Sequence, residues 1–255
     1  MRRIISVVVL TSLLAFSHLT FATKISSWER LIEQRNFNEI LTKTNQILTI
    51  DEYNQDATYY RAVALYKSRQ REESRTLFNQ IVAQYQLETN AISLYRYAMS
   101  YYYLGDNAQA ITLLGKVVTQ NRSRISAETH LGYAYAKLGQ YQAAIKAYTN
   151  VIKHIQNHSI YYNRALAHIG EGQLKAAGKD MERSIQHKPE FHLPYFDLIA
   201  IYVALKQPQK ALEWLETLLA RKVSDLSRLQ QDPDLKAFVA SDAYIQTLKK
   251  YGVDF

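Results

Sequence analysis

The chain contains no cysteine and very little glycine or proline. Its 255 residues include 8 Gly and 4 Pro. Without cysteine, the chain cannot form disulfides, use a thiol nucleophile, build a Cys-based metal site or carry a lipid-modified N-terminal cysteine. Turns between strands depend heavily on Gly and Pro, so their scarcity argues against a many-stranded β fold. The sequence therefore favours a fold built mainly from helices.

Sequence motifs for catalysis are also missing. The chain has no Gly-rich phosphate loop, no nucleophile elbow and no HExxH zinc motif. His154 and His158 stand four residues apart, a spacing able to hold a metal on a helix face, but no carboxylate lies near them in the sequence. We interpret this pair as a solvated helix end. The sequence predicts a protein that is not an enzyme and that needs no metal and no small-molecule cofactor.

The N-terminal segment predicts export. Arg2 and Arg3 precede an apolar run of 13 residues, from Ile4 to Phe16, and the small residues around Ala22 suit signal cleavage. We expect residues 1–22 to be a signal peptide and the mature chain to lie in the bacterial periplasm. In the alternative, the segment stays uncleaved and anchors the chain to the inner membrane, the only membrane association expected. The apolar run is shorter than the roughly 20 residues that a spanning helix needs.

Composition and charge narrow the range of partners. Apolar residues make up 47% and charged residues 21% of the chain, which is typical of a folded soluble protein. The formal charge is +8, but the basic residues are scattered and form no run of five. A mildly basic surface is the favoured interpretation. Nucleic acid is not an expected partner, because the chain has an export signal and no basic stripe.

The strongest pattern is an internal repeat of about 34 residues. Small residues predict close contact between two helices, and large residues four positions later predict filling of the gap beside them. The positions expected in the second helix of each pair lie 33 to 36 residues apart: Ile40, Ser74, Ala110, Ala144, Ala177 and Ala211. The large residues that follow them are Thr44, Phe78, Leu114, Tyr148, Met181 and Leu215. Small residues in the first helices are Ala62, Ala98, Gly132 and Ala165.

The clearest copy runs from Leu131 to Tyr148, LGYAYAKLGQYQAAIKAY. With Leu131-Gly132, Tyr135, Ala144 and Tyr148 in register, it resembles a tetratricopeptide repeat. The resemblance covers about residues 24–222 and is clearest over 91–189. It implies an all-α fold: a right-handed superhelical solenoid of about six helix-turn-helix repeats over residues 23–222. Gly105, Gly139 and Gly172 follow first helices, where a left-handed residue is expected.

Residues 223–255 are expected to form a short helical cap. Asp232 precedes Pro233, a combination typical of a helix start. Ser241 or Asp242 can begin a second helix. The cap would cover the apolar end of the last repeat, because about 33 residues without a metal or disulfide make a marginal independent domain.

The resemblance also implies a binding surface on the concave wall lined by the first helices. The positions used in the family predict an aromatic-rich groove that holds a protein or peptide segment, with Arg96 and His130 as polar contacts. The same frame places Leu166 and Asp197 at equivalent positions. The predicted groove residues are Tyr59, Tyr66, Tyr95, Arg96, Met99, Tyr102, His130, Tyr133, Tyr162, Asn163 and Phe196.

Two alternatives accompany this prediction. Several of the tyrosines could serve only to pack one helix against the next, since packing and binding positions are adjacent on a helix. Tyrosine faces also stack on sugars, so an accessory factor of the cell envelope that binds carbohydrate or peptidoglycan is the alternative function. The favoured function is a non-enzymatic, exported interaction scaffold, with a role in envelope assembly or secretion.

Overall fold

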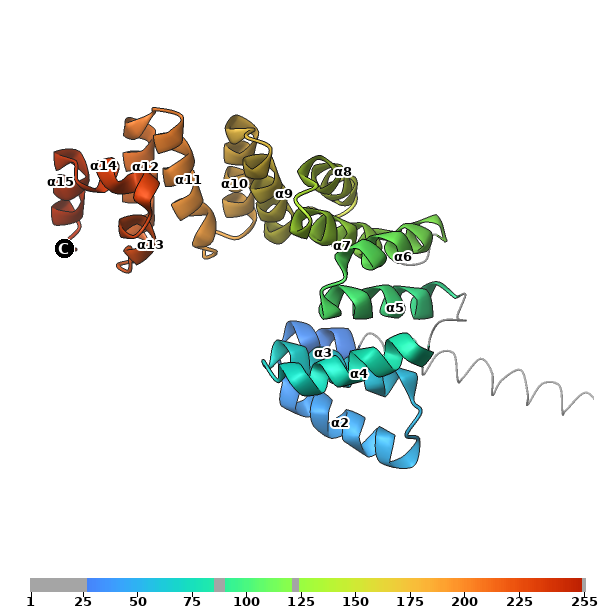
Figure 1. The fold of residues 1–255 in the computed structure, drawn as a ribbon. Coiled ribbons are helices and arrows are strands. Elements are labelled where there is room, and N and C mark those ends of the chain that lie inside the picture. The colour runs from blue at the N-terminus through green and yellow to red at the C-terminus, as the bar shows by residue number, and fades with distance from the viewer. Residues whose placement is uncertain (1–26, 85–89, 121–123, 254–255) are drawn as a thin grey trace, which may run out of the picture. The chain divides into compact units, whose positions relative to one another are not determined.

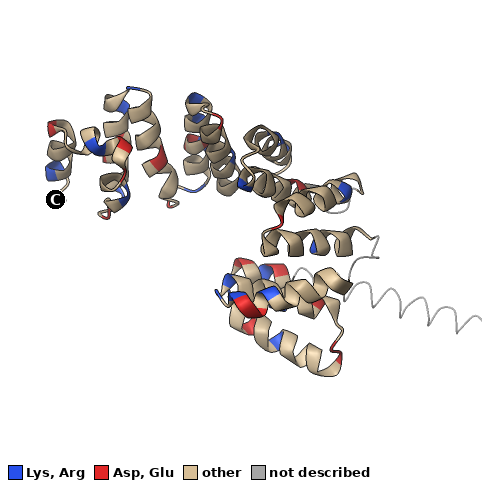
Figure 2. Ribbon diagram, viewed as in Figure 1, with Lys and Arg blue, Asp and Glu red and all other residues tan. Residues whose placement is uncertain are grey.

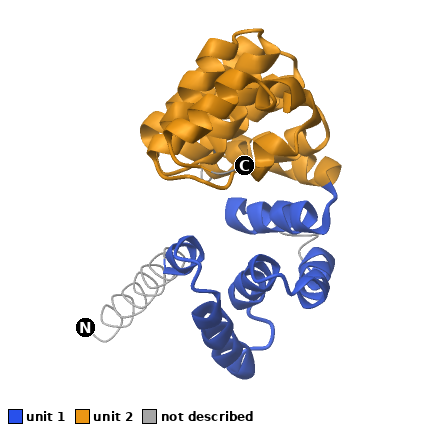
Figure 3. Cartoon of the chain, turned by 90° about the vertical axis from the view of Figure 1, so that its left-hand side faces the viewer, with its two compact units in different colours: residues 1–106 blue, residues 107–255 orange. Residues whose placement is uncertain are grey.

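The computed structural model describes residues 27–84, 90–120 and 124–253, and the regular elements of these segments are helices without any strand. The predicted signal segment, residues 1–22, lies outside the described residues. The chain divides into two compact units, residues 1–106 and residues 107–255, shown in different colours in Figure 3. Each unit is described by itself below.

The first unit consists of antiparallel helical neighbours that pack in chain order. After helical residues 27–33, α2 contacts α3, α3 contacts α4 and α4 contacts α5. The helices are labelled in Figure 1. Their bounds are α2, Phe37–Ile50; α3, Gln55–Lys67; α4, Arg71–Gln84; and α5, Ala91–Leu104.

The second unit continues the same arrangement and ends in short helices. From α6 to α12, each helix contacts the next one along the chain. The bounds are α6, Asn107–Thr119; α7, Arg124–Lys137; α8, Tyr141–Ile152; α9, His158–Gly170; α10, Leu174–His187; α11, Leu193–Ala204; and α12, Pro208–Ala220. The tail holds α13, Ser227–Gln230; the 3₁₀ helix η1, Pro233–Leu235; α14, Lys236–Val239; and α15, Asp242–Lys250.

The repeat positions read from the sequence form the core, as predicted. The six second-helix positions from Ile40 to Ala211, and the six residues that follow them by four, are each at most 1% exposed. Gly132 shows why a small residue is needed in a first helix. A Cβ atom built on it would lie 2.4 Å from Cε1 of Tyr148, itself 1% exposed. The ring of Tyr148 therefore occupies the space that a side chain at position 132 would take.

In the described part of the chain, the turns that follow six first helices share one backbone pattern. In each, one residue has φ between +57° and +93°, and the N–H of the next residue donates to the carbonyl five positions earlier at 2.8–2.9 Å. This bonding closes a helix with a left-handed residue. The left-handed residues are Arg35, Arg69, Gly105, Gly139, Gly172 and Lys206. The three glycines confirm the prediction, while the other three turns use basic residues, whose charge is favourable at a helix C-terminus.

Asparagine begins three of the first helices. Asn54, Asn90 and Asn157 each accept a hydrogen bond from the backbone N–H three residues later, at 2.9–3.0 Å. This side-chain cap satisfies an N–H group that the first turn of a helix leaves free. The caps and the left-handed turns together set where first helices start and stop.

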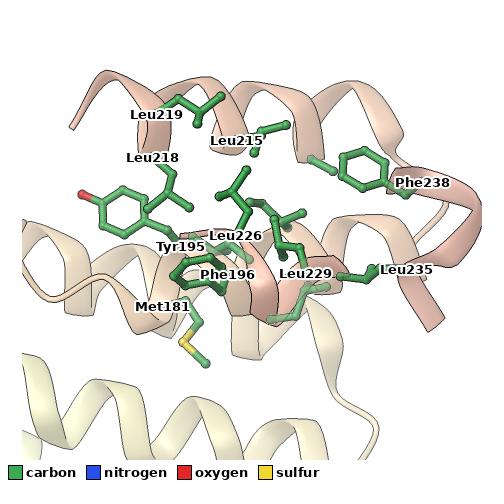
Figure 4. Packing of buried hydrophobic residues seen from close by; sticks show 14 of the residues in the cluster. Met181, Tyr195, Phe196, Leu215, Leu218, Leu219, Leu226, Leu229, Leu235 and Phe238 are labelled. Carbon is green, nitrogen blue, oxygen red and sulfur yellow. The ribbon is translucent and has the colours of Figure 1, made fainter. Parts of the chain in front are cut away.

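The C-terminal tail packs against α11 and α12. Leu226, Leu229, Leu235 and Phe238 join the buried cluster formed by residues of those helices (Figure 4). Asp232 accepts from the N–H of Asp234 at 2.9 Å and so begins η1, a 3₁₀ helix. Ser241, one of the two predicted caps, accepts from the N–H of Tyr244 at 3.3 Å and begins α15. The tail covers the apolar faces of the last helix pair, as expected of a cap.

Candidate partner-binding surface

In the first unit, three predicted groove residues lie in the core. Tyr59, Arg96 and Met99 are 7%, 4% and 1% exposed. Tyr59 belongs to a chain of packed aromatic rings that links the start of the unit to α5. Its ring centroid lies 5.3 Å from that of Tyr60 and 6.5 Å from that of Phe78. The chain runs through Trp28, Tyr60, Tyr59, Phe78, Tyr103 and Tyr66. Because these large rings surround Tyr59, its side chain is enclosed in the core and does not line a groove.

Arg96 connects α5 to α3. Its guanidinium forms an ion pair with Asp56 and lies 5.8 Å and 5.7 Å from the ring centroids of Tyr59 and Tyr60. Burial raises the pKa of Tyr60 to about 12, against the opposing effect of the Arg96 charge. A cation placed against two aromatic faces and a carboxylate has a well-defined position. Arg96 therefore stabilises the packing of the first unit.

The other predicted groove residues of the first unit, Tyr66, Tyr95 and Tyr102, are half-buried. Tyr66 packs on Tyr103, with ring centroids 4.7 Å apart, and the guanidinium of Arg71 lies 3.7 Å from its ring centroid. Each of these three tyrosines has only part of its surface exposed. They are the predicted residues of this unit that keep area available to a partner.

In the second unit, His130 and Tyr133 lie on α7 and are both half-buried. Nδ1 of His130 is 2.8 Å from the carbonyl oxygen of Ser126, which is a hydrogen bond if Nδ1 carries the proton. The rings of His130 and Tyr133 meet edge to face at 5.5 Å, and Tyr133 meets Tyr148 at 5.8 Å. Burial raises the pKa of the Tyr133 hydroxyl. Tyr133 thus packs against the repeat core on one side and is partly exposed on the other.

The remaining predicted residues lie on α9 and α11. Tyr162 and Asn163 are half-buried, and Phe196 is 8% exposed. The amide of Asn163 donates to the carbonyl of Ser159 at 2.6 Å, so its side chain is bound within its own helix. Leu166, four residues after Tyr162 on α9 and so on the same face of the helix, is 39% exposed.

Asp197 and Arg228 complete this surface. Arg228, from α13 in the tail, forms an ion pair with Asp197 of α11, and its Cζ atom lies 5.9 Å from the ring centroid of Phe196. Phe191, in the loop before α11, meets Tyr162 edge to face at 5.1 Å. We name the set Tyr162, Leu166, Phe191, Phe196, Asp197 and Arg228 the α9–α11 surface.

The electrostatics of the α9–α11 surface follow from partial burial. Burial raises the pKa of Tyr162 to about 12, and the adjacent charge of Asp197 adds to the rise. Burial also raises the pKa of Asp197, while the neighbouring Arg228 and Tyr162 oppose that rise. Two polar groups are thus held against aromatic rings where water has restricted access. Such groups interact more strongly with a charged ligand than fully solvated groups do.

A second polar cluster joins α8, α9 and α10. Arg164 donates to both carboxylate oxygens of Asp180, each at 2.7 Å, and to Thr149 at 3.0 Å. His168 lies beside it, with Nε2 3.8 Å from Asp180 and Nδ1 2.7 Å from Oε1 of Gln173. A histidine next to a carboxylate is a common catalytic pairing, but here Arg164 already engages both oxygens of Asp180, which is 5% exposed. The cluster acts as a clamp between helices.

Three further features of the described residues bear on function. No group of three or more His, Asp or Glu is placed to hold a metal ion in that part of the chain. No helix within it is both long enough and apolar enough to cross a membrane. Lysine and arginine are scattered along the helices of both units (Figure 2).

Four members of the α9–α11 surface were placed by the repeat frame, namely Tyr162, Leu166, Phe196 and Asp197, whereas Phe191 and Arg228 were not. The repeat frame places Leu166 and Asp197 at binding positions. Arg228 stands 31 residues after Asp197, in a tail outside the repeat register, so no spacing connects the two. The aromatic neighbours of Tyr59 also gave no distinguishing signal, because tyrosine suits core and surface equally well.

The comparisons with known proteins agree with this architecture. Models of the tetratricopeptide repeat match residues 56–86, 95–155, 129–190 and 168–237, which together make up more than half of the chain. The chain belongs to the tetratricopeptide-repeat family. Repeats of this family are protein-interaction modules, typically without catalytic activity, so the chain is a protein–protein interaction scaffold. No curated protein sequence matched it.

Solved structures show the same fold. MamA from Desulfovibrio magneticus RS-1 is 19% identical over 67% of this chain and 96% of its own, with a TM-score of 0.55. The C-terminal part of a repeat-containing protein from Cytophaga hutchinsonii is 15% identical over 87% and 93%, with a TM-score of 0.57. A putative kinesin light chain from Podospora anserina is 22% identical over 67% and 96%, with a TM-score of 0.54. At such identities the likeness shows the fold alone.

Proposed function

We propose that the chain is an exported scaffold that holds an extended protein or peptide segment on the faces of its first helices. In the second unit, the α9–α11 surface is the centre of the binding region. The observation that carries the proposal is the 39% exposure of Leu166, one turn from a half-buried Tyr162 whose hydroxyl interacts with the Asp197–Arg228 pair. An apolar residue bordered by aromatic and charged groups is typical of the centre and rim of an interaction site.

The half-buried tyrosines support the same proposal. Tyr66, Tyr95 and Tyr102 in the first unit, and Tyr133 in the second, each keep part of their surface exposed. Rings already held by neighbours lose little conformational entropy when a partner covers them. Binding of an extended segment would therefore use surfaces that are ordered before the partner arrives.

Export rests on the N-terminal sequence. The two arginines, the apolar run and the small residues up to Ala22 support signal cleavage and a periplasmic location. A scaffold in that compartment would act in envelope assembly or secretion. N-terminal sequencing of the protein recovered from a periplasmic extract should give Thr23 as the first residue. Recovery of the uncleaved chain in the membrane fraction would favour the anchored alternative.

Site-specific photocrosslinking tests the binding surface. A photoreactive amino acid replaces Leu166 in the full chain, and a matched variant carries it at Lys146, an exposed residue of the second helix α8. We expect protein adducts from position 166 and few from position 146. Equal adducts at both positions would contradict the assignment of the surface. Binding to isolated cell-wall sacculi with no protein adducts would favour the carbohydrate-binding alternative.

A further inference from the structure

The α9–α11 surface already contains a guanidinium, and it comes from the chain itself. Arg228 pairs with Asp197 and lies over Phe196, with 5.9 Å from Cζ to the ring centroid. Carboxylate and aromatic ring are the two groups that recognise an arginine side chain most strongly. The guanidinium of Arg228, held by Asp197 and Phe196, therefore indicates that this site accepts a cationic side chain.

The two members of the ion pair are not equally easy to displace. The side chain of Arg228 is 45% exposed, whereas that of Asp197 is 12% exposed. The guanidinium of Arg228 is already partly hydrated, so Arg228 itself loses little when it moves fully into water. Removing the cation from Asp197 without replacement would leave a carboxylate buried and unpaired, which is strongly unfavourable. A partner cation can replace Arg228 on Asp197. A partner anion that bound Arg228 would instead leave the Asp197 carboxylate unpaired.

Asp197 also has hydrogen-bonding capacity to spare. Its Oδ2 atom is buried and makes no hydrogen bond of normal geometry among the described residues, although the Tyr162 hydroxyl lies close enough to the carboxyl to lower its pKa. An incoming guanidinium or ammonium group brings several N–H donors, so it could bind Oδ2 as well as the oxygen now paired with Arg228. A donor-rich ligand would thus satisfy an acceptor that the free chain leaves unfilled.

The backbone that carries Arg228 is fixed independently of its side chain. Leu226 and Leu229, on either side of Arg228 in the sequence, are 3% and 1% exposed in the cluster shared with α11 and α12. Displacement of Arg228 therefore needs only a change of side-chain rotamer. The cap helix α13 stays in place when the ion pair opens.

We propose that the α9–α11 surface takes up an arginine or lysine side chain of the bound segment, and that Arg228 occupies this subsite in the free chain. This inference rests on the proposed function, since it names the chemistry of the segment held by the same surface. Arg228 acts as an internal competitor: a partner binds with its cation on Asp197 and releases Arg228 to solvent.

The test uses random 12-residue peptides displayed on phage and selected on the immobilised full chain. Peptides recovered on the wild type are synthesised, and their Kd is measured for the wild type, Arg228→Ala, Asp197→Asn and Arg221→Ala. Arg221 is a matched control: an exposed arginine at the end of α12 that lies over Tyr195, with 5.4 Å from Cζ to the ring centroid. Circular dichroism verifies that each variant is folded.

We expect the selected peptides to be enriched in Arg and Lys. Arg228→Ala should tighten their binding by about two- to fivefold, the range for loss of an exposed competing ion pair. Asp197→Asn should weaken binding, replacement of the peptide's arginine by citrulline should do the same in the wild type, and Arg221→Ala should leave the Kd unchanged.

Other outcomes separate the two proposals. Peptides rich in Asp and Glu, or weaker binding after Arg228→Ala, would show that Arg228 is itself the ligand contact and would overturn the inference. Peptides whose Kd is the same in all four proteins would also overturn it, while leaving the binding of extended segments intact. Failure to recover any peptide would count against both proposals.

Discussion

Replacing Gly132 by alanine tests the close approach on which each repeat depends. A helix interior normally gains about 1 kcal/mol when Gly becomes Ala. At position 132, however, the new Cβ would lie 2.4 Å from Cε1 and 2.7 Å from Cζ of Tyr148. Because Tyr148 is 1% exposed, its ring has no free space to enter. Overpacking of this kind costs about 1–3 kcal/mol, so we expect a net loss of up to about 2 kcal/mol.

Gly178→Ala is the matched control. Gly178 lies inside α10 of the same unit, and a Cβ built there would meet Ile201 and Leu198 at 3.8 Å, an ordinary contact. The same chemical change should therefore stabilise the chain by about 1 kcal/mol. Thermal unfolding followed by circular dichroism should give Tm shifts of opposite sign, each about 2–4 °C per kcal/mol for a chain of this size.

A variant that lacks the Tyr148 ring tests whether the clash with this ring causes the loss of stability. In a Tyr148→Ala variant the ring is gone, so adding Gly132→Ala should no longer lower Tm and should raise it slightly. A Gly132→Ala variant that unfolds at a higher temperature than the wild type would refute the reasoning. So would a loss of stability that is unchanged in the Tyr148→Ala background.

The other predictions concern single polar groups and one turn. Gly139 has φ +70° and no atom within 4 Å of a built Cβ, so Gly139→Ala should cost roughly 1 kcal/mol through backbone strain alone, measured by urea unfolding. Tyr244→Phe should stabilise the chain by about 1 kcal/mol in the same assay, because the buried hydroxyl has no hydrogen-bond partner among the described residues. Asp180→Ala should lower the free energy of unfolding by about 2 kcal/mol, below the full cost of breaking a buried pair because Arg164 is 18% exposed. For Asp197, burial raises the pKa, so its contribution to stability is greatest below the ordinary aspartate value of about 3.9 and is lost as pH rises from that value through the raised pKa of the folded chain. The Tm of the wild type should therefore decrease relative to that of Asp197→Asn as pH rises from that value, and parallel pH profiles would contradict the assignment.

The residues that were predictable from the sequence are those whose size decides the packing. Gly132, Ala144 and Tyr148 repeat at fixed distances because two helices can approach only where a side chain is small, and the gap beside them must be filled. That constraint acts in every repeat, so it leaves a regular pattern of small and large residues in the sequence. Sequence pattern therefore predicted the helix pairs, their order and the left-handed glycines.

The groove residues were harder to predict because exposure depends on neighbours. Tyr59 and Phe196 stand at positions that face the binding wall in the repeat frame, yet both are buried. The aromatic chain around Phe78 encloses Tyr59, and Arg228 from the tail lies over Phe196. In both places the deciding contact comes from another element, whose side-chain placement the local sequence does not specify.

The turns used by basic residues were missed for a related reason. Arg35, Arg69 and Lys206 take the left-handed conformation that the sequence led us to expect only of glycine. The surrounding hydrogen bonds fix the backbone there, and the helix C-terminus favours a positive charge. Residue type alone does not show that these two effects offset the strain of a left-handed residue other than glycine.

The neighbour-to-neighbour packing within each unit has a consequence for folding kinetics. Helices contact mainly the next helix in the chain, so most contacts join residues close together in sequence. Chains with such low contact order fold quickly, because little loop-closure entropy opposes the first contacts. In a repeat array, folding can begin in any helix pair and spread to its neighbours. A chain whose residues emerge one after another, as they do during synthesis, can therefore acquire structure progressively before its last residues emerge.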